Sequence, residues 1–306
     1  MKTAAVRARL RRYFTELPAP LAVFQVGASA FAGLRLPARE GGPVGRFVQP
    51  LPKGLVQPSL DRTNITDPGA LEGLVIEGLT RLGLHSGPVA LLLPELCARV
   101  FIVDLDSRPT SAREEEDVFR WRVKKQFPLL PEDARWSLAT QPAGAGERIV
   151  GVMARAAVVQ EYEALFARTR VRVRTVTLPS LSLARLLERT AENSVVQVNA
   201  EETALTVTAL VGNVFSLHRL KPLAADAAAA VVAQEAENTI HFLEDREQTK
   251  VQAVWVRSTL PDGEDGLIAA LGERLGLPVR SSSALTASFL EPTEGRLLGP
   301  LAGVAR

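Results

Sequence analysis

Residues 21–36 read Leu-Ala-Val-Phe-Gln-Val-Gly-Ala-Ser-Ala-Phe-Ala-Gly-Leu-Arg-Leu and predict two short strands joined by a tight turn. Apolar residues dominate both halves, and Gly27-Ala28-Ser29 supplies the small residues that a turn favours. The pattern restarts with strands at 194–199 and 203–211, and the Gly212-Asn213 step predicts a tight hairpin into a strand at 214–219. Two such rounds predict a duplicated α/β architecture with a boundary near residue 178.

The remaining elements follow from hydrophobic periodicity and from helix-capping residues. Asp67-Pro68 caps one helix, and Ser111 with Glu114 forms the capping box of another. The helices are expected at 67–82, 111–126, 156–168, 180–191, 225–245, 264–275 and 295–304. Further strands are expected at 89–93, 100–105, 137–141, 149–154, 171–178, 251–257 and near Val279.

Composition narrows the class of protein. The chain has 306 residues, enough for about two domains, and it contains no apolar run of the ~18 residues that span a bilayer. A single cysteine, Cys97, excludes an intramolecular disulfide and fits a reducing compartment, so we expect a cytoplasmic protein. The three histidines stand singly, which gives no metal-site spacing.

Charge is concentrated at the start of the chain. Residues 1–20 carry a net charge of +4, so the other 286 residues carry −2 of the total of +2, which argues against a nucleic-acid partner. Val6, Leu10 and Phe14 share one face of a predicted basic amphipathic helix. This helix either packs on the body or contacts anionic lipid through residues 1–17.

Several segments, taken in order, carry a resemblance to a known family. The run 99–106, the acids 114–116 and the stop at 124–128 are followed by the segment 152–176 and the helix start 235–242. Their order and spacing resemble PilM proteins of type IV pilus assembly, relatives of the cell-division protein FtsA. The resemblance implies an actin-like (ribonuclease H-like) α/β fold with two domains and four subdomains. A basic helix at 1–19 would precede a first domain at 20–178, with an FtsA/PilM-type insertion at about 88–155, and a second domain at 179–306.

The nucleotide-binding loops depart from that family pattern. Actin-like ATPases cradle phosphate and Mg²⁺ with Asp-Ile-Gly hairpins, but here Gln25 and Gln197 replace the two acids and Asn199 replaces a glycine. A neutral amide cannot supply the carboxylate charge that Mg²⁺ and phosphoryl transfer need. The remnants of the nucleotide site are expected at Gln25, Gly27, Ser29, Gln197, Asn199, Thr203 and Glu235.

The resemblance and these departures together predict a scaffold that is not an enzyme and needs no cofactor. The alternative from a different class is an active ATP·Mg²⁺-binding switch of the same machinery. A second alternative is a haloacid-dehalogenase-like phosphatase, because Asp104-Leu-Asp106 ends an apolar strand and an acidic run lies at 262–265.

A partner site is expected on the helix at 112–127. Phe119, Val123 and Phe127 form a stripe flanked by Arg120 and Lys124, a pattern that also fits simple core packing. In PilM-like proteins the groove between the insertion and the first subdomain holds the N-terminal peptide of the inner-membrane protein PilN. The resemblance therefore implies a PilN-like partner, within a pilus or type II secretion platform, on the cytoplasmic side of the inner membrane. The groove residues are expected to be Arg120, Lys124 and Phe127.

Overall fold

The structure is a computed structural model that describes residues 19–36, 45–105, 111–127, 130–144, 146–224, 226–288 and 290–304. The predicted basic helix at 1–17 lies outside the described residues. Within the described ranges, no helix is both long enough and apolar enough to cross a membrane.

The first domain is built on a five-stranded sheet in the order β3-β2-β1-β4-β8. Its strands are β1 (Ala22–Val26), β2 (Ala30–Arg35), β3 (Arg46–Pro50), β4 (Gly87–Leu92) and β8 (Val171–Thr177). The predicted hairpin is confirmed, since β1 pairs antiparallel with β2 and parallel with β4. Helices α2 (Pro68–Arg81) and α4 (Ala156–Ala164) pack their apolar residues on one face of this sheet.

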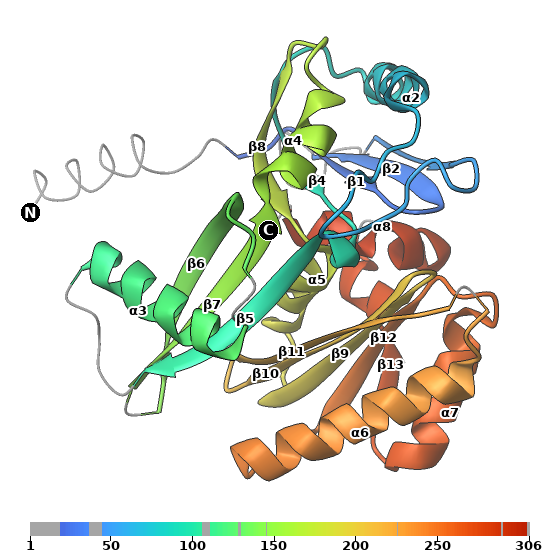
Figure 1. Cartoon of the computed structure of the whole chain (residues 1–306). Helices are drawn as coiled ribbons and strands as arrows, with labels where there is room; N and C mark the ends of the chain where they lie inside the picture. The colour runs from blue at the N-terminus through green and yellow to red at the C-terminus, as the bar shows by residue number, and fades with distance from the viewer. Residues whose placement is uncertain are drawn as a thin grey trace, which may run out of the picture.

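An insertion with its own three-stranded sheet, in the order β5-β7-β6, follows β4. It contains β5 (Ala98–Leu105), α3 (Ala112–Gln126), β6 (Ala134–Ala143) and β7 (Gly146–Arg155), preceded by the short 3-10 helix η1 (Glu95–Cys97). Figure 1 shows α3 lying across one face of this sheet. Because β4 belongs to the central sheet, the expected start of the insertion near residue 88 is too early, and the separate sheet begins at Ala98.

The second domain repeats the plan with a sheet in the order β11-β10-β9-β12-β13. Its strands are β9 (Ser194–Glu201), β10 (Ala204–Val211), β11 (Val214–Pro222), β12 (Ala253–Ser258) and β13 (Val279–Ser281). Gly212 and Asn213 have φ of 61° and 60°, which is the left-handed geometry that the predicted tight hairpin requires. Helices α6 (Ala229–Glu247) and α7 (Gly263–Leu275) cover the outer face.

Two helices fill the space between the sheets. Helix α5 (Pro179–Leu187) packs on β9 and β10, and α8 (Pro292–Val304) packs on β1 and β2, while the short 3-10 helix η2 (Ser282–Thr286) contacts α8. The C-terminal helix therefore returns to the first sheet, where Leu298 and Leu301 are buried against Val23 and Leu92. In Figure 1 this helix (red) lies between the two sheets and beside α5. The two domains are thus joined through a shared core as well as through the chain.

Candidate functional site

The two phosphate-type hairpins face each other across a narrow cleft between the domains. Gln25, Gly27 and Ser29 line one side, and residues 201–203 line the other. Four of the predicted remnants, these three and Thr203, therefore lie in the cleft. The cleft has a volume of about 190 Å³. Small-molecule sites usually occupy about 300–1,000 Å³, so this cleft is smaller than a usual ligand site.

An arginine that the sequence analysis did not single out fills this cleft. Arg257 on β12 is buried, and its Nη1 donates to Asn199 Oδ1 and to Glu201 Oε1, both at 2.7 Å. Its Nε donates to the carbonyl oxygen of Arg296 at 2.7 Å, and Gln25 Nε2 donates to Glu201 Oε1 at 3.3 Å. The charge of Arg257 is therefore neutralised by Glu201 within the cleft, while Gln25 Oε1 is buried without a hydrogen-bond partner among the described residues.

The residues present do not fit a magnesium nucleotide, which the fold family would imply. Mg²⁺ prefers carboxylate and phosphate oxygens in near-octahedral geometry. Gln197 is fully buried and exchanges hydrogen bonds of 3.0 and 3.1 Å with Ser282, so its amide serves the core of the second domain. In the described part of the chain, no group of three or more His, Cys, Asp or Glu side chains is placed to hold a metal.

Glu235, like Gln197 and Asn199, is a predicted remnant that does not line the cleft. It belongs to α6, where its carboxylate pairs with Lys221 of β11. The residues of α6 that are buried pack on the outer face of the second sheet, and Glu235 does not line the cleft. The resemblance placed this residue in the nucleotide site, and its position in the fold corrects that expectation.

A second buried polar cluster connects the domains beside the cleft. Glu95 of η1 is only 1% exposed and accepts hydrogen bonds from Ser180 N at 2.6 Å and from Ser180 Oγ at 2.9 Å. Ser180 Oγ also lies 3.0 Å from His218 Nε2 on β11. Burial, with repulsion from Glu201 as a smaller cause, raises the pKa of Glu95 to about 8, and burial lowers the pKa of His218. Both side chains are therefore uncharged at neutral pH.

The sequence contains only a faint signal for this cluster, namely a single acid, Glu95, that follows the apolar run 89–93 after Pro94. Cys97, two residues later, is buried beside Asn64 and Tyr162, and burial raises the pKa of its thiol to about 12. A thiol with that pKa is inert at neutral pH. Cys97 is part of the hydrophobic core of the first domain.

The Asp104 carboxylate, proposed as a phosphatase nucleophile, is held in an ion pair. Arg148 donates to its two oxygens, from Nε at 2.5 Å and from Nη2 at 3.1 Å, and also donates to Ser216 Oγ of β11 at 2.8 Å. The hydrogen bond from Arg148 lowers the pKa of Asp104. Through Arg148 the pair connects the insertion to the second domain. Asp106, the second acid of the predicted phosphatase motif, lies outside the described residues.

The two faces of the insertion sheet have different environments. On one face, Phe119 of α3 is fully buried against Trp136, and a side-chain atom at Gly151 would lie only 2.1 Å from the Phe119 ring. On the other face, Val150 and Val152 are half-buried and border a hollow of about 430 Å³. The hollow lies between the insertion and the first domain, and it is lined further by Val159, Val176, Leu178 and Leu181.

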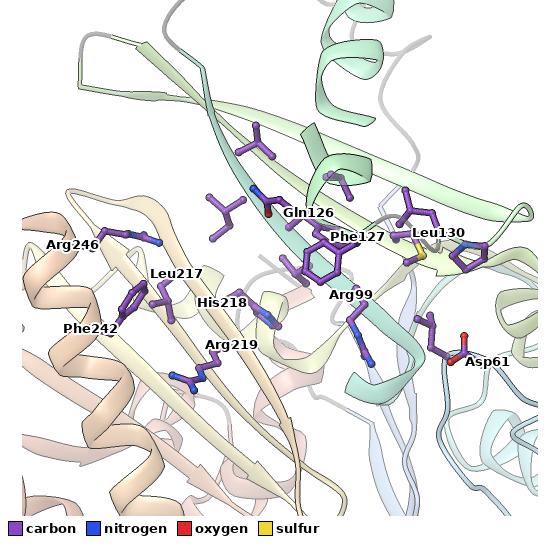
Figure 2. A pocket seen from close by; sticks show the side chains of 18 residues that line it. Asp61, Arg99, Gln126, Phe127, Leu130, Leu217, His218, Arg219, Phe242 and Arg246 are labelled. Carbon is purple, nitrogen blue, oxygen red and sulfur yellow. The ribbon is translucent and has the colours of Figure 1, made fainter. Parts of the chain in front are cut away.

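The three predicted groove residues lie on the α3 side and not in that hollow. Arg120 pairs with Glu116 at 2.6 Å, and Lys124 is exposed on the outside of α3. Phe127 is 51% exposed and packs edge-on against Phe101 with a centroid distance of 5.1 Å. It lines a different groove, between the insertion and the second domain (Figure 2). The expected groove and the residues assigned to it are therefore on opposite faces of the insertion sheet.

Comparisons with known proteins find similarity in structure. No protein-family model matches the sequence, and a search of the curated proteins finds no match. A chain of the PilM-PilN type IV pilus biogenesis complex is 15% identical, with a TM-score of 0.74 over 94% of this chain and 96% of that chain. The ethanolamine utilization protein EutJ from Carboxydothermus hydrogenoformans is 13% identical, with a TM-score of 0.50 over 94% and 90% of the two chains. The cytoplasmic domain of EpsL, an inner membrane component of the type II secretion system of Vibrio cholerae, is 12% identical with a TM-score of 0.48 over 78% and 82%.

The fold is therefore that of the actin-like proteins, with two related domains and an insertion in the first. Within this class the chain is PilM-like in fold and divergent in sequence. The expectation of this fold is confirmed.

Proposed function

We propose that this protein is a scaffold of a type IV pilus assembly platform that holds a short cytoplasmic segment of a PilN-like inner-membrane protein and does not hydrolyse ATP. The observation that carries the proposal is the closed cleft, in which Arg257, Glu201, Asn199 and Gln25 bind one another. An actin-like fold that has lost its Mg²⁺ carboxylates retains two domains joined through a shared core and their surface grooves. Binding of a partner segment is the activity that these features support.

The hollow between the insertion and the first domain is the proposed site for that segment. Its apolar lining and its volume of about 430 Å³ suit a few apolar side chains of an extended peptide. The likeness to a chain of the PilM-PilN complex and the resemblance of the sequence to PilM proteins both favour a membrane-protein partner. Peripheral attachment to the cytoplasmic side of the inner membrane would follow from such a partner.

A charged substitution in the hollow tests this site. Val152→Glu places a carboxylate among apolar side chains, and we expect at least a tenfold loss of affinity for the N-terminal cytoplasmic peptide of a PilN-like membrane protein. The loss follows because binding would remove the charge from water. Isothermal titration calorimetry measures the affinity. Thermal unfolding checks that the variant is folded, and Val150→Glu serves as a second variant if it is not.

The control is Lys124→Glu on the opposite face of the insertion, which should leave the affinity unchanged. If Lys124→Glu weakens binding and both valine variants bind like the wild type, then the partner site is on α3 and the proposed site is wrong.

A further inference from the structure

A larger groove lies on the other side of the insertion, between its edge and the second domain. It has a volume of about 650 Å³, with β5 and the end of α3 on one wall and β11 with α6 on the other. Figure 2 shows Phe127 and Arg99 on the insertion side, facing His218 and Phe242 across the groove. This groove is separate from the hollow described above, since the two share none of their described lining residues.

Each wall of the groove exposes a large aromatic ring to solvent. Phe127 is 51% exposed and Phe242 is 53% exposed. The floor between them is apolar, with Phe101 and Val103 from β5 and Leu217 from β11. Exposed aromatic rings beside a concave apolar floor are characteristic of sites that bind other proteins.

Both strands that border the groove are sheet edges. Strand β5 is the outer strand of β5-β7-β6, and β11 is the outer strand of β11-β10-β9-β12-β13. Five consecutive residues of β5, 99–103, line the groove, so the strand presents its backbone edge and not only one face. Alternate N–H and C=O groups of an edge strand point away from its partner and can pair with an added extended chain.

The charge around the groove is positive. Arg99 and Arg219 are exposed on β5 and β11, and in the described part of the chain no carboxylate lies within 4.0 Å of either guanidinium. Arg246 also lines the groove, but Glu247 pairs with it at 2.6 Å. Asp61 is the acidic residue of the lining, and His218 is uncharged at neutral pH because burial lowers its pKa.

We propose that this groove binds an extended segment of a partner protein in which apolar residues alternate with Asp or Glu. Alternate side chains of an extended chain point to opposite sides, so one set enters the apolar floor while the other reaches the guanidinium groups of Arg99 and Arg219. Backbone hydrogen bonds to the edge of β5 fix the direction of the segment. The site does not depend on the hollow between the insertion and the first domain, and a scaffold with both grooves connects two different partners.

The probe is a fluorescently labelled eight-residue peptide of alternating Leu and Glu, with both ends blocked, and anisotropy reports its binding to the full chain. We expect binding that weakens with added salt, since exposed charges are screened. Arg219→Glu should reduce the affinity at least tenfold, and Arg99→Glu should do the same. The matched control is Arg172→Glu, which reverses the charge of another exposed arginine, on β8, away from the groove.

Two further measurements locate the peptide and test its chemistry. Backbone amides at 99–103 should exchange more slowly with deuterium when the peptide is bound, and a peptide of alternating Leu and Lys should not bind. No binding of the Leu-Glu peptide at ~1 mM, equal binding of the Leu-Lys peptide, or a loss with Arg172→Glu as large as with Arg219→Glu would each overturn the proposal. Val152→Glu should leave this binding unchanged, which separates failure of this proposal from failure of the proposed function.

Discussion

Replacing Arg257 by alanine is expected to lower the free energy of unfolding by about 3–5 kcal/mol, the usual cost of removing one partner of a buried ion pair. The side chain of Arg257 is 3% exposed and binds three separate groups at 2.7 Å. Its removal leaves the carboxylate of Glu201, which is 16% exposed, without its cation. Chemical denaturation measures the change.

Two control variants identify the cause. Arg280→Ala removes an arginine from a partly exposed pair with Glu192, so it should cost no more than about 1 kcal/mol. Adding Glu201→Gln to Arg257→Ala should recover part of the loss, because no unpaired carboxylate then remains. A loss below about 1 kcal/mol for Arg257→Ala would show that the cleft is not held closed by this ion pair.

Glu95→Gln is expected to stabilise the protein relative to the wild type at alkaline pH and to change little at pH 5. The pKa of Glu95 is raised from 4.5 to about 8 in the folded protein, mainly by burial. The folded state therefore holds a proton that the unfolded state releases, and this contribution to stability is fully present below pH 4.5 and is lost as the pH rises through about 8. Each difference of one in pKa corresponds to about 1.4 kcal/mol, so the loss amounts to several kcal/mol at most.

Glutamine cannot ionise, and its amide can replace the protonated carboxyl as a partner of Ser180. The difference in melting temperature between Glu95→Gln and the wild type should therefore grow between pH 5 and pH 9. Glu192→Gln is the control, because the pKa of Glu192 is lowered by its hydrogen bond with Arg280 and the residue stays charged over that range. A difference that is constant with pH, or that shrinks toward alkaline pH, would contradict the assignment of a neutral Glu95.

Local patterns in the sequence predicted most of the elements. The Gly27-Ala28-Ser29 turn and the Gly212-Asn213 step each require a small residue or a left-handed conformation, and those requirements appear directly in the residue types. The stripe on α3 was also informative. Phe119 and Val123 are buried, but the end residue Phe127 extends past the sheet and stays half exposed, because a periodic pattern does not show where the covering surface ends.

Contacts between distant residues were not predictable in the same way. Arg257 meets Glu201 across 56 positions of sequence, and α8 returns to a sheet whose first strand lies more than 250 residues earlier. The resemblance placed Glu235 in the nucleotide site, but α6, the helix that carries Glu235, packs on the outer face of the second sheet. Local periodicity does not predict that the cleft is closed. It also does not predict which face of the insertion sheet borders the first domain.

The most direct test of the account is a calorimetric titration of the purified chain with ATP in the presence of Mg²⁺, repeated with a chelator. The cleft of about 190 Å³, with Gln25 in place of a carboxylate and Arg257 bound to Glu201, predicts no binding tighter than about 100 μM and no difference between the two titrations. An affinity of about 1 μM that disappears when Mg²⁺ is chelated would contradict the account and would favour an ATP-dependent switch.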